Sequence, residues 1–194
     1  MKIKTRNLVM TAILSGIAFI LMFVNFSVPF MPFFIKLDIS ELPGLLAAFS
    51  MGPWYGVCVC FIKNLLNFIT ASTTGGVGEL SNFILGASFV LTAGYIYSHK
   101  KNKTGAILGS LAGSVLMGIL CVPSNYFITY PIYTKLMPLE QILGLYKEIF
   151  PKAGGLLSCL IMFNMPFTML KGVLCSVITF LIYKRLSPVI KGKR

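Results

Sequence analysis

Stretches without a charged side chain cover most of this chain of 194 residues. They run over residues 7–35, 42–62, 64–78, 80–98 and 104–134, and residues 153–183 contain only Lys171. A helix that crosses the hydrocarbon layer needs about 20 apolar residues. With 56% hydrophobic and 11% charged residues, the chain has more apolar surface than one soluble core of this size can bury. We therefore expect an all-α integral membrane protein.

Prolines, glycines and charges divide these stretches into six predicted transmembrane helices, which form a single domain over residues 1–194. The approximate spans are 8–28, 42–52, 54–69, 79–97, 104–128 and 157–183. Pro29 and Pro32 end the first span, because proline lacks an amide hydrogen and disfavours helix in the residue before it. In the last outer loop, residues 139–150 predict a short amphipathic helix at the membrane surface.

The basic residues indicate which ends of the spans face the cytoplasm. They cluster in the amino-terminal tail, the linker after the fourth span and the carboxyl-terminal tail: Lys2, Lys4, Arg6, Lys100, Lys101, Lys103, Lys184, Arg185, Lys191, Lys193 and Arg194. No acidic residue lies in these segments. By the positive-inside rule, both termini are expected to be cytoplasmic. The net charge of +12 is therefore a sign of topology and does not predict a nucleic-acid partner.

Sequence patterns of enzymes and metal sites are missing. There is no GxSxG, no HExxH and no Walker loop. Cys58 and Cys60 are separated by one residue, a poor spacing for zinc, and the five cysteines are expected to be inert core thiols. The sequence predicts neither a catalytic site nor a metal or cofactor. Without a nucleotide-binding loop, active uptake would require an ATPase partner.

Polar side chains within the apolar spans are the candidates for function, because each costs a few kcal/mol to place in lipid. Asn164, Thr168 and Lys171 follow an i, i+4, i+7 pattern and share one face of the sixth span. This face predicts either an outward-facing cavity or a helix contact. Glu79, at a similar depth, is the expected partner of Lys171.

A glycine-rich turn at residues 75–78 leads into the fourth span at Glu79 and Asn82. The free amides of that helix start would point at the outer cavity, although ordinary capping by Glu79 is the simpler alternative.

Further amides near the outer ends of the spans either complete a polar ring or only pack helices together. They are Asn64 and Asn67 on the third span and Asn125, next to Tyr126, on the fifth. Lys63 is a secondary candidate, with snorkelling toward a surface as the alternative.

Small residues at four-residue spacing allow helices to approach closely. Gly105, Gly109 and Gly113 on the fifth span predict packing within the protein. Ala12 and Gly16 on the first span fit packing within the protein or against another subunit equally well.

Several motifs resemble the riboflavin-specific substrate-binding component of energy-coupling factor (ECF) transporters. In chain order they are FIKLDISELP at 34–43, KNLL at 63–66, GGVGELSNF at 75–83, NYF at 125–127 and PFTMLKG at 166–172. The likeness runs through all six predicted spans. The first and third motifs are distinctive beyond hydrophobicity.

The resemblance implies a multi-pass protein in the plasma membrane of a prokaryote. It would bind riboflavin, as a transported ligand, from outside and associate with one transmembrane coupling protein and two ATPases. Ala12 and Gly16 would form the surface for the coupling protein, and residues 30–40 the loop that closes over the vitamin.

By the same likeness Glu79, Asn125 and Lys171 are pocket residues. Thr168 departs from the family, which has Asn there, and Asn164 one turn away is expected to substitute. The full candidate ligand-binding set is Leu37, Asp38, Asn67, Val77, Gly78, Glu79, Asn82, Asn125, Tyr126, Asn164, Thr168 and Lys171.

Two alternatives remain. The chain could be a related component for another vitamin or a purine-like solute, or a membrane-embedded enzyme that uses Glu79 and Lys171 as an acid and base pair.

Overall fold

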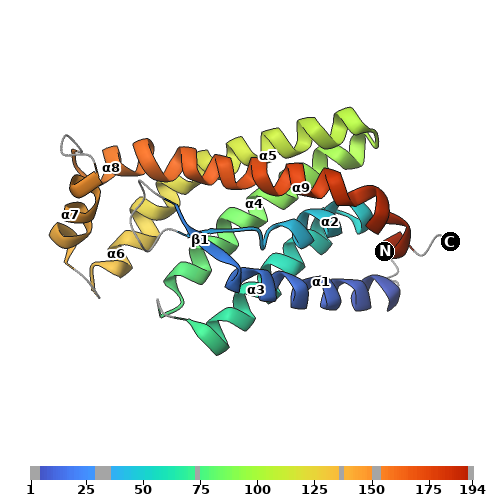
Figure 1. Cartoon of the computed structure of the whole chain (residues 1–194), viewed down its shortest axis with the longest axis horizontal. Coiled ribbons are helices and arrows are strands. Elements are labelled where there is room, and N and C mark those ends of the chain that lie inside the picture. Colours follow the sequence, from blue (N-terminus) through green and yellow to red (C-terminus); the bar gives the residue numbers. More distant parts are fainter. Residues whose placement is uncertain (1–4, 29–35, 73–74, 136–137, 150–153, 192–194) are drawn as a thin grey trace.

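A computed structural model describes residues 5–28, 36–72, 75–135, 138–149 and 154–191. Elongated helices lie side by side along most of the molecule, and a small helix, α7, stands at one end (Figure 1). In chain order the elements are α1 (Thr5–Phe23), β1 (Asn25–Ser27), β2 (Lys36–Asp38), α2 (Leu42–Met51), α3 (Pro53–Ala71), α4 (Val77–His99), α5 (Lys103–Ser124), the π-helical turn η1 (Asn125–Thr129), α6 (Tyr130–Tyr133), α7 (Leu139–Ile149), α8 (Leu156–Cys159), the π-helical turn η2 (Leu160–Asn164) and α9 (Met165–Lys191).

Five helical stretches in the described residues are long and apolar enough to cross a membrane: Thr5–Phe23, Pro53–Ala71, Val77–His99, Lys103–Tyr133 and Leu156–Tyr183. They correspond to five of the six predicted spans.

The remaining predicted span, 42–52, is much shorter than a membrane is thick. Helix α2 has 10 residues, which corresponds to about 15 Å at 1.5 Å per residue, roughly half of the hydrocarbon layer. Every residue from Leu42 to Phe49 is buried. A helix that is apolar on all sides is stable when protein surrounds it on all sides, so α2 forms the centre of the bundle. Its amino terminus consequently lies deep within the protein.

The first span also ends earlier than predicted. Helix α1 stops at Phe23, and the chain continues as β1, which pairs antiparallel with β2. In this hairpin Asn25 lies opposite Asp38 and Phe26 lies opposite Leu37. The Asn25 side chain donates to the carbonyl of Met22 and so satisfies an acceptor at the end of α1. A purely helical prediction was therefore wrong in this detail. Of the loop predicted at 30–40, residues 30–35 lie outside the described residues.

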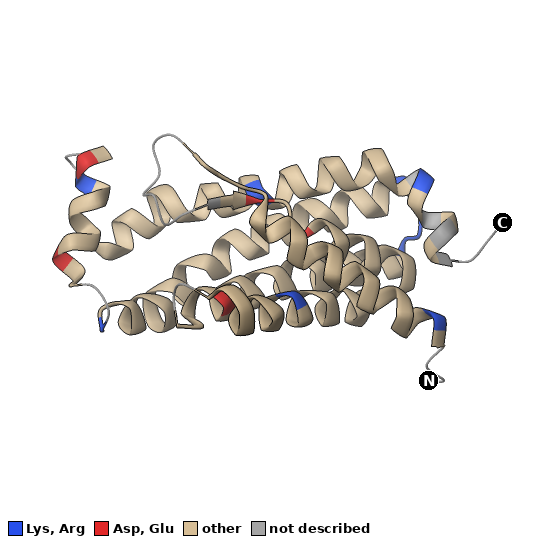
Figure 2. Ribbon diagram, turned by 60° about the horizontal axis from the view of Figure 1, so that its bottom comes forward, with Lys and Arg blue, Asp and Glu red and all other residues tan. Residues whose placement is uncertain are grey.

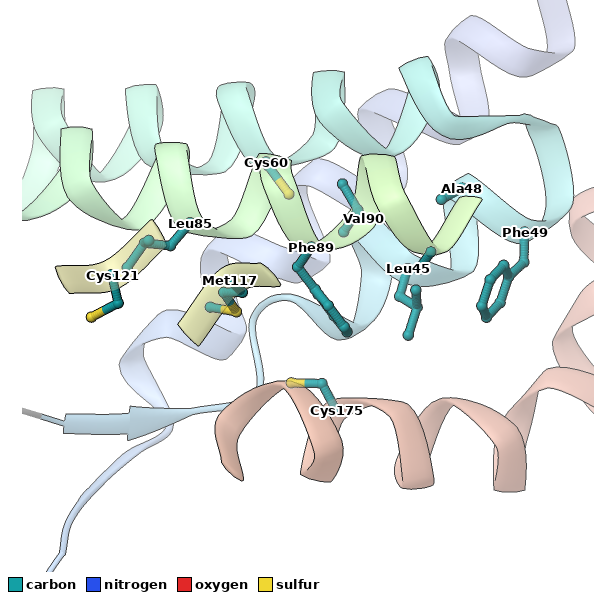
Figure 3. Packing of buried hydrophobic residues seen from close by; sticks show 11 residues of the cluster. Leu45, Ala48, Phe49, Cys60, Leu85, Phe89, Val90, Met117, Cys121 and Cys175 are labelled. Carbon is teal, nitrogen blue, oxygen red and sulfur yellow. The ribbon is translucent and has the colours of Figure 1, made fainter. Parts of the chain in front are cut away.

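The main hydrophobic core joins α2 to α3, α4, α5 and α9 (Figure 3). Leu45 and Phe49 of α2 pack there with Phe89 of α4, Met117 of α5 and Cys175 of α9. All five cysteines are free thiols. Cys58 is exposed and the other four are buried, so the prediction of core thiols was wrong only for Cys58.

The glycines of α5 confirm the prediction of close packing within the protein. A Cβ on Gly109 would lie 2.7 Å from the carbonyl oxygen of Ala93, and one on Gly113 would lie 2.7 Å from that of Phe89. Both distances are too short for any side chain, which explains how α4 and α5 run in backbone contact. Gly16 on α1 differs, because a Cβ there would meet nothing within 4 Å.

Candidate functional site

Lys171 forms a salt bridge with Asp38, and this ion pair connects α9 to the β-hairpin. Its Nζ donates to Oδ2 of Asp38 at 2.9 Å and to Oδ1 of Asn82 at 3.4 Å. Both ionic side chains are almost entirely buried. The expectation that Glu79 pairs with Lys171 was therefore wrong: no ion pair joins these two among the described residues, and the counterion comes from the strand β2 instead.

A second ion pair lies at the deep end of α2. The Nζ of Lys63 is 2.6 Å from Oε1 of Glu41, and neither side chain is exposed. Cys60 donates through its Sγ to the other carboxylate oxygen of Glu41. Snorkelling of Lys63 toward a surface was thus the wrong interpretation, because the ammonium group has a buried partner. The position of Glu41 at the amino terminus of α2 is also favourable for a negative charge.

Ser40 joins the two ion pairs. Its hydroxyl accepts a hydrogen bond from Lys63 at 2.7 Å and donates to Oδ1 of Asp38, and its backbone N–H donates to the same oxygen. The result is a continuous polar chain from Lys171 through Asp38, Ser40 and Lys63 to Glu41. Burial alone would raise the pKa of Asp38, but the charges of Lys171 and Lys63 outweigh it, and the pKa falls to about 2. Asp38 is therefore a carboxylate at any physiological pH.

The glycine turn before α4 has the conformation that its sequence requires. Gly75 and Gly76 have φ angles of 62° and 92°, which side chains rarely tolerate. Gly76 is the N-cap of α4, and Val77 and Gly78 begin that helix. In the first turn, Glu79 accepts a hydrogen bond from Nδ2 of Asn67 on α3 at 2.8 Å. The predicted glycine turn and the polar residues beside it therefore do lie together.

Asn125 and Asn164 each stand at the end of a π-helical turn. Asn125 begins η1 and Asn164 ends η2. Such turns are rare and frequently occur at functional sites. Oδ1 of Asn125 accepts from Ser81 on α4, and Oδ1 of Asn164 accepts from Tyr146 on α7. Both asparagines are buried.

The amphipathic segment predicted at 139–150 is the helix α7, described up to Ile149. Its buried residues Ile142 and Tyr146 pack with Tyr130, Cys159 and Leu160 of the same chain. Its apolar face is therefore covered by the protein itself, which the expectation of a helix at the membrane surface did not include.

A cleft of about 390 Å³ lies beside the glycine turn. Its walls are mainly apolar and come from α3, α4 and α6, and its polar lining includes Glu79 and Asn64. Asn64 is buried and uses its Nδ2 to bond the carbonyl of Cys60. Within the described chain, nothing donates to its Oδ1. Cavities of this size and composition are typical of small-molecule sites.

The remaining candidates divide between the interior and the surface. Thr168 is buried, and its hydroxyl contacts Sγ of Cys121. Leu37 is half-buried in β2. Tyr126 differs, because it is 40% exposed and its ring makes an edge-to-face contact with Phe127. The structure therefore does not bring Tyr126 into the polar cluster.

Five residues of these networks were missed or undervalued in the sequence: Ser40, Glu41, Lys63, Tyr130 and Tyr146. For the pair of Glu41 and Lys63, the sequence contained a signal that the two residues lie at the same depth. Glu41 and Lys63 are equally far along the chain from Gly52, at the tight turn between α2 and α3, and so had to lie at equal depth.

A family model described as "ECF transporter, substrate-specific component" matches residues 6–183. The chain is 36% identical to the riboflavin transporter RibU of Staphylococcus aureus, over 97% of this chain and 94% of that protein. It is 33% identical to the riboflavin transporter FmnP of Bacillus subtilis, over 98% and 97% respectively.

Among solved structures, the chain is similar to one described as "Structure and mechanism of the S component of a bacterial ECF transporter", with a TM-score of 0.75 and 34% identity over 95% of this chain and 97% of that one. The fold, the polar cluster and the match over nearly the whole chain lead to one conclusion: this protein belongs to the substrate-specific components of ECF transporters.

Proposed function

We propose that this protein captures riboflavin from outside the cell as the substrate-binding subunit of an ECF importer. The observation that carries the proposal is the match to riboflavin transporters over at least 94% of their length, at 36% and 33% identity. The family consists of transporter components, so the protein binds its ligand and does not convert it. An acid and base role for Glu79 and Lys171 loses its basis, because each has another partner.

The proposed binding site takes in the polar residues around the β-hairpin, α4, α5 and α9, together with the adjoining cleft. Riboflavin has a flat tricyclic ring with carbonyls and an imide, and a tail with several hydroxyls. Amides and Lys171 supply donors for the carbonyls, while the carboxylate of Glu79 in the cleft lining accepts from the imide or hydroxyls. The apolar walls of the cleft suit the ring. Of the candidates, Tyr126 is the one with the weakest structural support.

The proposed topology is one domain with six crossings and both termini in the cytoplasm. The start of α1, the end of α9 and the connection between α4 and α5 lie at the same end of the molecule (Figure 1). Lys and Arg gather at that end, while Asp and Glu lie elsewhere (Figure 2). This distribution supports a cytoplasmic location for that end by the positive-inside rule. In the second crossing, α2 would cover the inner half and the segment leading from β2 the outer half.

The proposed partners are one transmembrane coupling protein and two ATPases in the plasma membrane. Ala12 is exposed and Gly16 has free space above its Cα. The opposite face of α1, with Thr11, Leu14, Ser15 and Ala18, is buried against the bundle. Two small residues on the free face allow a partner helix to approach closely.

The test of this function is riboflavin binding by the purified, detergent-solubilised protein. We expect a flavin absorption spectrum after purification from flavin-containing cells, and saturable quenching of riboflavin fluorescence after the ligand has been removed. An absence of saturable quenching would overturn the substrate assignment. A panel with other vitamins and purines would then identify the ligand.

A further inference from the structure

Three side chains form a hydrogen-bonded chain at the outer end of the molecule. The hydroxyls of Tyr130 and Tyr146 are 2.7 Å apart, and the Tyr146 hydroxyl donates to Oδ1 of Asn164 at 2.8 Å. All three residues are buried, and Tyr146 is 0% exposed. None of these tyrosines is among the ligand candidates.

The number of available protons determines which group donates in each of these hydrogen bonds. A phenol has one proton, and Tyr146 uses it for Asn164. Tyr130 must therefore be the donor in the bond between the two tyrosines. Burial, followed by the neighbouring Tyr130, raises the pKa of Tyr146 above its ordinary value, so its hydroxyl keeps the proton.

An amide whose oxygen is held by a donor has a fixed orientation. With Oδ1 of Asn164 occupied by Tyr146, its two N–H donors point the other way. The Tyr130 hydroxyl also interacts with the Asn164 side chain, which engages at most one of these N–H groups. Among the described residues, Nδ2 is not one of the fully enclosed atoms without a partner. At least one N–H donor of Asn164 therefore remains for a ligand. Asn164 ends η2, one helical turn before Thr168 on α9.

The hydrogen bonds between Tyr130, Tyr146 and Asn164 also link the two π-helical turns. Tyr130 follows η1, and its backbone N–H donates to the carbonyl of Asn125. Asn164 ends η2. Tyr146 lies between them on α7, where Ile142, Cys159 and Leu160 hold its ring. Helix α7 therefore connects the two segments that present Asn125 and Asn164.

We propose that Tyr146 is a positioning residue for ligand binding, which orients the Asn164 amide so that its N–H donors face a carbonyl acceptor of the ligand. The proposal rests on the proposed function and extends it to α7, a helix in an outer loop that otherwise has no role in ligand binding. Tyr130 supports the same orientation from one step further away.

The experiment measures riboflavin affinity by fluorescence quenching in a double-mutant cycle of Tyr146→Phe and Asn164→Ala. Phenylalanine keeps the buried ring and removes only the hydroxyl. Because one hydrogen bond contributes about 1 kcal/mol, we expect Tyr146→Phe to weaken binding by about five- to tenfold. In the Asn164→Ala background, the same change should alter affinity by less than about twofold, since its effect passes through Asn164. Tyr130→Phe should give a smaller loss than Tyr146→Phe.

Two controls separate positioning from general damage. Tyr95→Phe, at an exposed site on α4, should bind like the unmodified protein. Asn164→Asp keeps the acceptor for Tyr146 but has no N–H donor, so it should lose affinity as Asn164→Ala does.

Three results would overturn the positioning role while leaving riboflavin binding established: unchanged affinity in Tyr146→Phe, equal losses from Tyr146→Phe with and without Asn164, or full binding by Asn164→Asp. Failure of the unmodified protein to bind riboflavin would overturn the proposed function itself, and with it the positioning role.

Discussion

The Nζ of Lys63 lies 2.6 Å from Oε1 of Glu41, with both side chains fully buried in the middle of a membrane protein. The short helix α2 brings them together, because it begins inside the bundle and places Glu41 at the depth of Lys63. Ser40 extends the contact to Asp38 and Lys171. The charges of Lys63 and Lys171, which would be costly to expose to lipid, thus neutralise the two carboxylates of the segment 38–41. These ion pairs hold the segment inside the protein.

Lys63→Met is expected to destabilise the fold severely. Removing one partner of a buried ion pair leaves the other charge unpaired, at a typical cost of about 3–5 kcal/mol. Of the side-chain contacts that the described residues make with the Glu41 carboxylate, only the weak one from Cys60 would remain. Thermal unfolding in detergent, followed by size-exclusion chromatography, measures the loss. The double variant Lys63→Met/Glu41→Leu should recover much of the stability, and an equally unstable double variant would contradict this explanation.

Lys171→Met is expected to weaken riboflavin binding by more than about tenfold, because a hydrogen bond from a charged donor contributes about 1.5–3 kcal/mol. The protein should still express, because Asp38 keeps its hydrogen bonds from Ser40 and the nearby charge of Lys63. Asp38→Asn is the matched variant, since it removes the counterion and keeps the lysine. If Lys171 contacts the ligand, Lys171→Met should impair fluorescence quenching more than Asp38→Asn does. Equal losses would indicate that the lysine acts only through its ion pair with Asp38.

The ion pair between Lys171 and Asp38 is expected to resist acid. The folded pKa of Asp38 is about 2, below its ordinary value of 3.8. A depressed carboxyl pKa stabilises the folded state above the ordinary value, and the stabilisation is lost as the pH falls from 3.8 toward 2. The stability that Asp38 contributes should therefore stay constant from neutral pH down to this window, as measured by unfolding of the protein in detergent at a series of pH values. In Asp38→Asn the loss in this window should be absent, and a midpoint well above pH 3.8 would contradict the assignment.

Two helix glycines, Gly113 in the contact between α4 and α5 and Gly16 on the free face of α1, should differ in their response to substitution by valine. Gly113→Val would push against the carbonyl of Phe89 and should lower the melting temperature, since overpacking costs about 1–3 kcal/mol. At Gly16 a Cβ has nothing within 4 Å among the described residues, so Gly16→Val should leave folding and riboflavin binding intact.

Uptake of riboflavin by cells that contain the partner proteins should nevertheless fall in Gly16→Val. Normal uptake by this variant would remove Gly16 from the partner surface.

The sequence by itself determined the membrane class, the approximate position of the long helices and the close packing through Gly109 and Gly113. These are local properties: apolar runs, helix period and small residues can be read along the chain without knowing what lies beside it. It also located the polar residues that the structure gathers around α9, including Lys171, Asn164 and Asp38.

Only the tertiary structure decided which groups pair. Lys171 finds Asp38 and not Glu79, Lys63 finds Glu41, and Tyr146 orients Asn164, because α2 is half-length, the strands return into the bundle and α7 packs on its end. These contacts join residues far apart in the chain. A charged residue within an apolar run predicts that the protein supplies a partner for it. The packing of neighbouring helices determines which residue that partner is.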